Sequence, residues 1–165
     1  MTQPRETTLL LQLTIHASRY LMPLFPQSRD ELRRAYVDAW RKHRNRLPLE
    51  PLEVQIADVI ALHPEYHRLL EGEAPALERD YSPEGGQANP FLHMGLHLAV
   101  RDQVATDRPA GIRQAFAAIA KRAGSGHDAE HQVIECLAES LWEAQRAGTA
   151  PDEAGYLEKV RRLAI

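Results

Sequence analysis

The amino-acid sequence predicts an all-α fold, a single domain built as a bundle of five to six helices. Three observations predict it. Apolar residues recur at i, i+3 and i+4 through most of the chain. These runs begin at N-capping residues or prolines and end at glycines, which are ordinary helix signals. No stretch alternates apolar with polar residues in the way that a half-buried strand does.

The first firm helix is predicted over about residues 28–46, after an N-terminal extension of residues 1–21. The extension carries four leucines without a clean period, so it fits both a short amphipathic helix and a disordered segment. Residues 22–165 are predicted to form the helical bundle domain. Ser28 with Glu31 forms a capping box ahead of Tyr36 and other apolar residues at helical spacing. The basic run that ends this helix complements the macrodipole.

Prolines predict where the following helix begins and breaks. Pro48 and Pro51 open a second helix, and Pro64 disfavours a helical conformation at His63, so the helix breaks or kinks there. Pro64 then starts a new turn. Residues 72–88 hold several glycines and prolines, which predicts a long loop of the kind that is often functional or mobile.

The stretch Asn89–Gln103 predicts the central, buried helix. Asn89 is an N-cap and Pro90 takes the first helical position, where its missing N–H costs nothing. The residues that follow are apolar around most of the helix circumference. His93 and His97, one turn apart, therefore lie on an inward-facing stripe.

Three further helices complete the predicted bundle. Pro109 begins a fourth helix that Gly124 ends, and Ser125 caps a fifth helix over about residues 126–147. Pro151 and the acidic pair after it start the last helix. On the fifth helix, one face is predicted to hold His127, His131, Ile134, Ala138, Leu141 and Gln145.

The histidine spacing predicts a metal site. Six of the eight histidines form i, i+4 pairs, whereas chance gives roughly 0.4 such pairs in a chain of this composition. Two such histidines on one helix face can chelate one ion, and bundles build metal sites from facing helices. The predicted ligands are His93, His97, His127, His131, His67 and Glu130, with His63 and Glu135 as weaker candidates. Imidazole and carboxylate without thiolate suit a divalent transition metal such as Zn, Fe or Mn.

Two classes of function follow from these residues. In the first, a bound metal activates water for hydrolysis or binds oxygen in redox chemistry. The string HDAEH also matches a short zinc-peptidase pattern, with Glu130 as the candidate general base. In the alternative, the protein is a non-enzymatic structural or interaction module whose histidines form a buried polar network. Whether the protein is an enzyme is left open.

The composition limits partners and location. Hydrophobic residues make up 44% and charged residues 26% of the chain, as in ordinary globular proteins. The net charge of -3 predicts no nucleic-acid and no membrane partner, while other partners and the oligomeric state are left open. The single cysteine, Cys136, excludes an intramolecular disulfide, and no membrane span or signal peptide is recognisable, so we expect a cytoplasmic protein.

Several segments together resemble a known family. They are HPEYH, NPFLHMGLHLAVRDQVATDRPAGI, HDAEHQVIECLAESLWEAQRAGTAPDEAGYL and, near the start, SRDELRRAYVDAWRKHR. Over about residues 22–165 they resemble the bacterial domain-of-unknown-function family 1841. The resemblance implies a small, mostly helical, cytoplasmic bacterial protein. It brings no activity, substrate or cofactor with it.

Overall fold

The predicted all-α fold is confirmed. The computed structural model describes residues 29–72 and 89–165, and these contain seven α-helices, one short 3-10 helix and no strand. The structure has one α-helix more than predicted, because the break before Pro64 separates the short helix His67–Glu71 from the helix Pro51–Ala61. The predicted N-terminal extension, residues 1–21, and nearly all of the predicted 72–88 loop lie outside the described residues.

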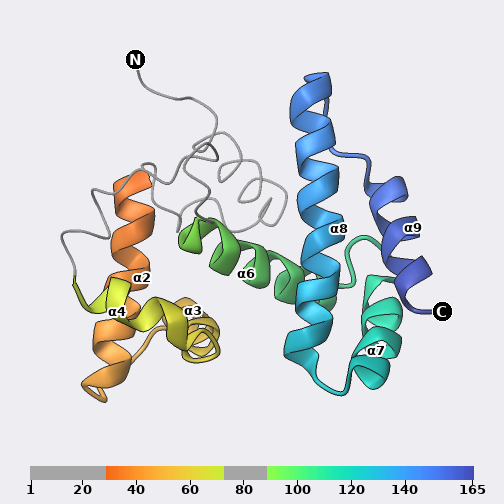
Figure 1. The fold of residues 1–165 in the computed structure, drawn as a ribbon. Coiled ribbons are helices and arrows are strands. Elements are labelled where there is room, and N and C mark those ends of the chain that lie inside the picture. Colours follow the sequence, from red (N-terminus) through yellow and green to blue (C-terminus); the bar gives the residue numbers. More distant parts are fainter. Residues whose placement is uncertain (1–28, 73–88) are drawn as a thin grey trace. The chain divides into compact units, whose positions relative to one another are not determined.

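The chain divides into two compact units, and the boundary falls after Leu98 within a continuous helix. The N-terminal unit contains four described elements and the first half of a fifth. They are α2 (Arg29–Arg44), α3 (Pro51–Ala61), η1 (Pro64–Tyr66), α4 (His67–Glu71) and the start of α6 (Pro90–Thr106). α2 packs against both α3 and α4, as Figure 1 shows.

The core of the N-terminal unit joins α6 to the earlier helices. From α6, Phe91 and Met94 are fully buried in one apolar cluster with α2 and α3, and the ring of Phe91 meets that of Tyr36 edge-on. Ring centroids lie 5.8 Å apart, a geometry that aromatic pairs favour. The other buried members are Val37, Ala39, Trp40, Ile56, Val59, Ile60 and Leu70. This packing fixes the rotation of α6 about its own axis.

The break at Pro64 is confirmed. α3 begins with the predicted Pro51, next to a capping box made by Glu50 and Glu53, and ends at Ala61. His63 leaves the helical conformation with φ -123° and ψ 69°, and Pro64 opens η1. The carbonyl of His63 accepts a hydrogen bond from the N–H of Tyr66 at 3.0 Å, which closes the new turn.

The predicted cap of α6 is also confirmed. The side-chain oxygen Oδ1 of Asn89 accepts hydrogen bonds from the N–H groups of Phe91 (3.0 Å) and Leu92 (3.2 Å). Pro90 occupies the first helical position, where no donor is needed.

The C-terminal unit contains the second half of α6 and three helices that pack against one another: α7 (Ile112–Ala123), α8 (Gly126–Ala147) and α9 (Glu153–Leu163). The hydroxyl of Tyr156 on α9 donates a 2.6 Å hydrogen bond to Oε1 of Gln103 on α6. Ser125 caps α8 through a 3.0 Å bond from the N–H of Asp128, and Gly148 ends it in the left-handed conformation, as predicted.

The predicted start of the fourth helix at Pro109 is wrong. α7 begins three residues later, at Ile112, because Gly111 has a φ of 97°, which lies outside the α-helical region. The carboxylate oxygen Oδ1 of Asp107 accepts hydrogen bonds from the N–H groups of Gly111 (3.1 Å) and Arg113 (3.0 Å). A carboxylate from the preceding turn therefore satisfies the first donors of the helix.

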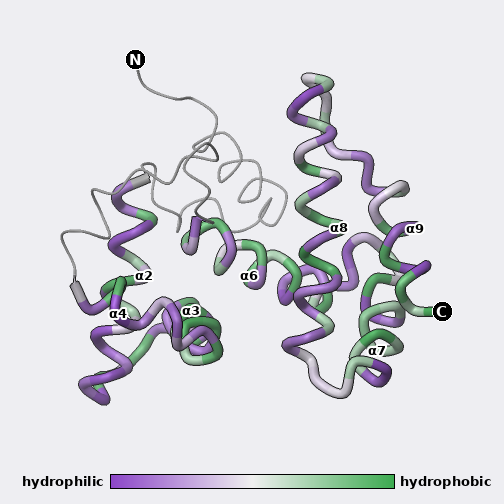
Figure 2. Tube along the Cα trace, in the orientation of Figure 1, coloured by the Kyte–Doolittle hydropathy of each residue, from purple (hydrophilic) through white to green (hydrophobic). Residues whose placement is uncertain are grey.

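The buried side of α8 is rotated from the predicted face. Ala138, expected to face inward, is exposed, whereas Ser140 is buried. The remaining buried residues of α8 are Ala129, Glu130, Val133, Ile134, Leu137, Leu141 and Ala144. His127 and His131 lie at the edge of this stripe and are half-buried. Figure 2 shows hydrophobic residues alternating with hydrophilic ones along α8.

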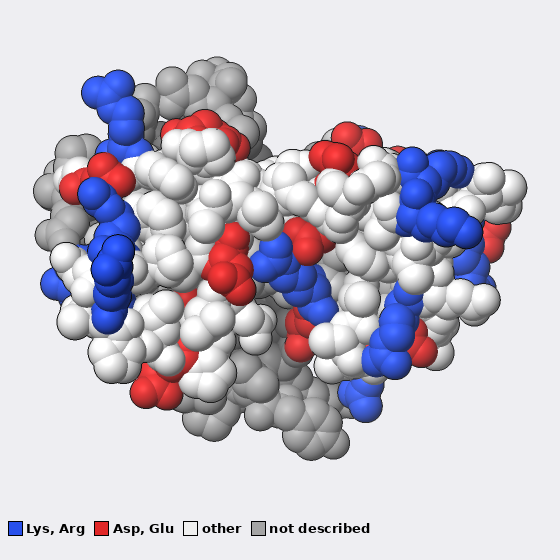
Figure 3. All heavy atoms as spheres, turned by 90° about the horizontal axis from the view of Figure 1, so that it is seen from below, with Lys and Arg blue, Asp and Glu red and all other residues white. Residues whose placement is uncertain are grey.

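Charged side chains of both signs are interspersed on the face shown in Figure 3. The basic run at the end of α2 also has acidic neighbours. Arg41 pairs with Asp38 at 2.7 Å and Lys42 with Glu53 at 2.6 Å, so acidic partners accompany these cations. No helix within residues 29–72 and 89–165 is long and apolar enough to cross a membrane.

The cap at Asn89 gives a testable prediction about the helix that carries two of the histidines. Asn89→Ala removes the acceptor of two backbone N–H groups, so the free energy of unfolding should fall by about 1 kcal/mol in urea titrations. Asn89→Ser keeps a capping oxygen and should stay close to wild type. Equal losses in the two variants would show that the cap contributes nothing.

Candidate metal centre

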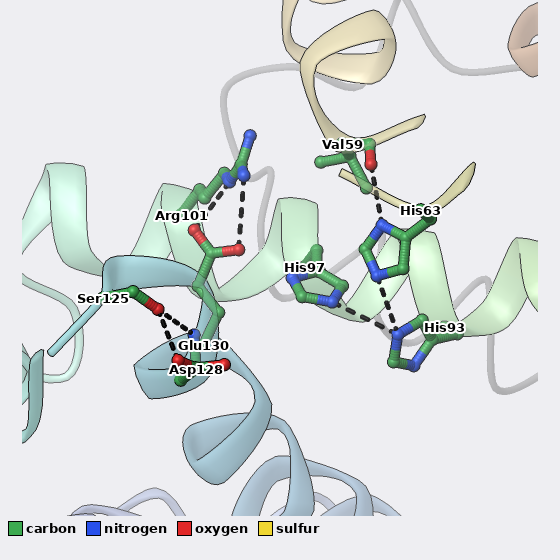
Figure 4. A network of polar contacts seen from close by, with 8 residues as sticks. All are labelled: Val59, His63, His93, His97, Arg101, Ser125, Asp128 and Glu130. Carbon is green, nitrogen blue, oxygen red and sulfur yellow. Dashed lines mark hydrogen bonds and ion pairs between the residues drawn. The ribbon is translucent and has the colours of Figure 1, made fainter. Parts of the chain in front are cut away.

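Three histidines of the N-terminal unit bring their Nε2 atoms together. Nε2 of His93 lies 3.1 Å from that of His63 and 3.3 Å from that of His97, as Figure 4 shows. Their ring centroids are 4.7 to 5.0 Å apart, and the rings meet at steep angles. His63 and His97 are buried, and His93 is half-buried. We call these three residues the histidine cluster.

Local sequence positions each member of the histidine cluster. His93 and His97 share one face of α6 because they are one helical turn apart. His63 comes from the end of α3, where Pro64 forces the backbone out of the helix. The Nδ1 atom of His63 lies 2.7 Å from the carbonyl oxygen of Val59, so the ring is held by a strong hydrogen bond.

That hydrogen bond determines where the proton of neutral His63 lies. A carbonyl oxygen only accepts, so the proton is on Nδ1, and Nε2 presents a lone pair. The lone pair points toward Nε2 of His93, as Figure 4 shows. In many metal proteins a histidine ligand likewise donates its other N–H to a carbonyl, so the orientation of His63 is compatible with metal binding.

The nitrogen–nitrogen distances match a shared metal ion. With metal–nitrogen bonds of about 2.1 Å, neighbouring ligand nitrogens are about 3.0 Å apart in octahedral and about 3.4 Å apart in tetrahedral geometry. The observed values of 3.1 and 3.3 Å lie between these limits. The buried histidine cluster can therefore hold a metal ion.

His67, predicted as a ligand, contacts the backbone of α3 and the ring of Trp40. Its Nε2 atom is 2.9 Å from the carbonyl oxygen of Ile60, and its ring lies against Trp40 with centroids 4.4 Å apart. One ring nitrogen of His67 is thus used by the backbone. Its role as a ligand stays a prediction.

Tyr66 forms an aromatic wall beside the cluster. Its ring is parallel to that of His63 at 5.5 Å and edge-on to that of His93 at 6.1 Å. Burial raises the pKa of Tyr66, and the negative charge of Glu65 adds to the increase, so the phenol is neutral at physiological pH.

The second predicted pair lies in the C-terminal unit. The rings of His127 and His131 are 4.4 Å apart on α8. Between them, Glu130 forms a two-pronged ion pair with Arg101 of α6: Nε to Oε1 is 2.8 Å, and Nη2 to Oε2 is 3.3 Å. Glu135 is exposed. The predicted convergence of these residues with His93 and His97 stays a prediction.

The ion pair bears on the predicted chemistry of Glu130. Its carboxylate is buried, and its negative charge is balanced by the guanidinium of Arg101. Glu130 thus has a clear packing role in the C-terminal unit, and its predicted roles as ligand and general base stay predictions.

Comparison with known families supplies an identification. The family model described as a domain of unknown function (DUF1841) matches residues 28–162. The chain belongs to this family. The match includes the histidine cluster and parts of both compact units, and it confirms the resemblance seen in the sequence. Comparisons with curated proteins and with solved structures gave no match.

Two residues of this DUF1841 chain differ from what the sequence predicted: one was a weaker candidate, and the other was not predicted at all. His63 was a weaker candidate, yet it supplies one of the three converging nitrogens. Arg33 was missed: it is 1% exposed, and its guanidinium lies 5.2 Å from the ring centroid of Phe91. A signal for Arg33 existed, because it stands at helical spacing with Tyr36 and Trp40 on the buried face of α2.

Removal of one partner from the Arg101–Glu130 pair tests its packing role. Glu130→Gln leaves a guanidinium without its counter-charge, so the free energy of unfolding should fall by about 1–3 kcal/mol in urea titrations. We expect less than the cost in a fully buried pair because the side chain of Arg101 is 26% exposed. Glu135→Gln, on the exposed side of the same helix, is the matched control and should change stability by less than about 0.5 kcal/mol. Similar values for both variants would contradict this role.

Proposed function

We propose that this protein binds a divalent transition metal ion through His63, His93 and His97. The observation that carries the proposal is the meeting of three Nε2 atoms at 3.1 and 3.3 Å, with His63 oriented by the Val59 carbonyl. A metal ion that lies among three imidazole nitrogens at such distances can bind all three.

The donor set favours Zn, Fe or Mn. It contains imidazole nitrogens and no thiolate, which suits these ions. A metal held by three histidines keeps a coordination position for water or substrate, so the proposed activities are hydrolysis by metal-activated water and oxygen or redox chemistry. The sequence-based candidates His67, His127, His131 and Glu130 remain proposed as additional ligands.

A second candidate function rests on the backbone contacts of the histidines. His63 and His67 each contact a carbonyl of α3, at 2.7 and 2.9 Å, as expected of buried imidazoles that only order the fold. In that case the protein is a structural or interaction module. The two proposals differ in whether metal affinity depends on the cluster.

Metal content tests the first proposal directly. Untagged protein, purified without chelators or a nickel column, should carry about one ion of one element per chain by elemental analysis. His63→Ala, His93→Ala and His97→Ala should each reduce the affinity by more than the roughly 10–100-fold that loss of a neighbour of a ligand causes. His43→Ala, an exposed histidine of α2, is the matched control and should keep the metal.

Further variants make this measurement decisive. Circular dichroism verifies that each variant folds, and histidine-to-glutamine versions retain a polar side chain if an alanine variant does not. A His127→Ala/His131→Ala double variant tests the additional ligands separately. If the folded wild-type protein binds no Zn, Fe or Mn, the metal-binding proposal is wrong and the structural module is favoured.

A bound metal should also stabilise the N-terminal unit, since it links α3 to α6 across thirty residues of chain. At a free ion concentration of 100 times Kd, binding should add about 2.7 kcal/mol to the free energy of unfolding. Thermal unfolding with and without added ion measures this increase. The gain should be present in His43→Ala and absent in His97→Ala, and an equal gain in both would point to metal bound elsewhere.

A further inference from the structure

A pocket of about 270 Å³ lies at the end of α2, beside α4. Its volume is close to the lower limit for small-molecule sites, which is roughly 300 Å³. The lining residues are Trp40, Arg41, Arg44, Asn45, Leu70 and Glu71. None of them belongs to the histidine cluster, so an inference about this pocket does not depend on the proposed metal site.

The inner part of the pocket is apolar. Leu70 is 2% and Trp40 6% exposed, and both belong to the core of the N-terminal unit, so the pocket reaches that core. The imidazoles of His67 and His43 lie against the indole of Trp40, with ring centroids 4.4 and 5.3 Å from it. These contacts hold the indole in place. A ligand in the pocket therefore meets a fixed apolar surface on its inner side.

The indole of Trp40 carries a hydrogen-bond donor without an acceptor. Its Nε1 atom is buried, and none of the described residues accepts a hydrogen bond from it. A buried N–H without a partner is costly, and buried indole N–H groups usually have one. Because Trp40 also lines the pocket, a ligand that brings an acceptor atom can supply this partner.

The outer part of the pocket carries more positive than negative charge. Of the lining residues, Arg41 and Arg44 are cationic and Glu71 is anionic, which leaves one net positive charge. Nη1 of Arg44 lies 2.9 Å from Oε1 of Glu71, and Nη2 of Arg41 lies 2.7 Å from Oδ1 of Asp38. Ion pairs between exposed side chains contribute little to stability, and a guanidinium has several other N–H donors. Both arginines can therefore also bind an anion in the pocket.

We propose that this pocket binds a small organic carboxylate. A carboxylate carries one negative charge, which matches the net charge of the lining, and its two oxygens fit the fork of a guanidinium. The carboxylate contacts Arg41 and Arg44, and one of its oxygens accepts the indole N–H of Trp40. The apolar body of the ligand lies against Leu70. A phosphate dianion would bring more negative charge than the lining offsets.

Two-dimensional ¹H–¹⁵N NMR of the whole chain reads the indole N–H directly. Trp40 and Trp142 are the two tryptophans of the chain, and a spectrum of Trp142→Phe assigns their indole signals. Labelled wild-type protein is titrated with sodium butyrate and, separately, with butyramide at constant ionic strength. Butyrate should shift the indole signal of Trp40 saturably. Butyramide should bind about tenfold more weakly, because it has the same shape without the charge. The exposed Trp142 of α8 is the internal control, and its signal should not move.

Arginine variants test where the carboxylate lies. The double variant Arg41→Gln/Arg44→Gln should weaken butyrate binding by about tenfold or more, because it removes both charged donors. Arg34→Gln, at an exposed position of the same helix, is the matched control and should bind butyrate as wild type does. The same spectra verify that each variant is folded.

Four outcomes would overturn the proposal. They are an indole signal of Trp40 that does not shift saturably with butyrate, equal affinity for butyramide, unchanged affinity in the arginine double variant, and tighter binding of inorganic phosphate than of butyrate. None of these outcomes bears on the metal site, since the pocket and the histidine cluster share no residue.

Discussion

The burial of Phe91 and Met94 fixes the geometry on which the candidate site depends. Both side chains are fully enclosed among apolar residues of α2 and α3, so α6 cannot rotate about its axis without exposing them. At 100° per residue, the directions of His93 and His97 are then determined as well. The packing of Phe91 and Met94 therefore orients the imidazoles of His93 and His97 by fixing the rotation of α6.

The histidine cluster shows how a core accommodates polar groups. A buried imidazole without hydrogen bonds is costly, and the backbone carbonyl of Val59 offsets part of that cost for His63. Val59 is within reach only because Pro64 stops α3 and turns His63 back over the last helical turn. The same residue that ends a helix thus sets the tautomer of a candidate ligand. Places where polar groups gather in a core are often functional.

In the C-terminal unit, the buried charge of Glu130 is compensated by an ion pair. Glu130 lies on the buried side of α8, where a carboxylate without a counter-charge would be strongly disfavoured. Arg101 forms an ion pair with it through two contacts. Tyr156 and Gln103 form a second polar contact between α9 and α6. Both of these contacts join groups of complementary kinds. In the histidine cluster, by contrast, three groups of the same kind meet, and this asymmetry is why the metal proposal concerns the N-terminal unit.

The sequence by itself determined the all-α class, the capped start of α6, the break before Pro64, the ends of α8 and the i, i+4 histidine pairs, because each depends on residues within one or two helical turns. Only the tertiary structure decided that His63 meets His93 and His97, since thirty residues separate them and their meeting depends on how α3 and α6 share a core. It also decided that Asp107 caps α7 through a turn with positive φ at Gly111, and that α8 buries Glu130 and exposes Ala138. Local rules specify where a helix begins and which residues share a face; packing decides which face is buried and which side chains meet there.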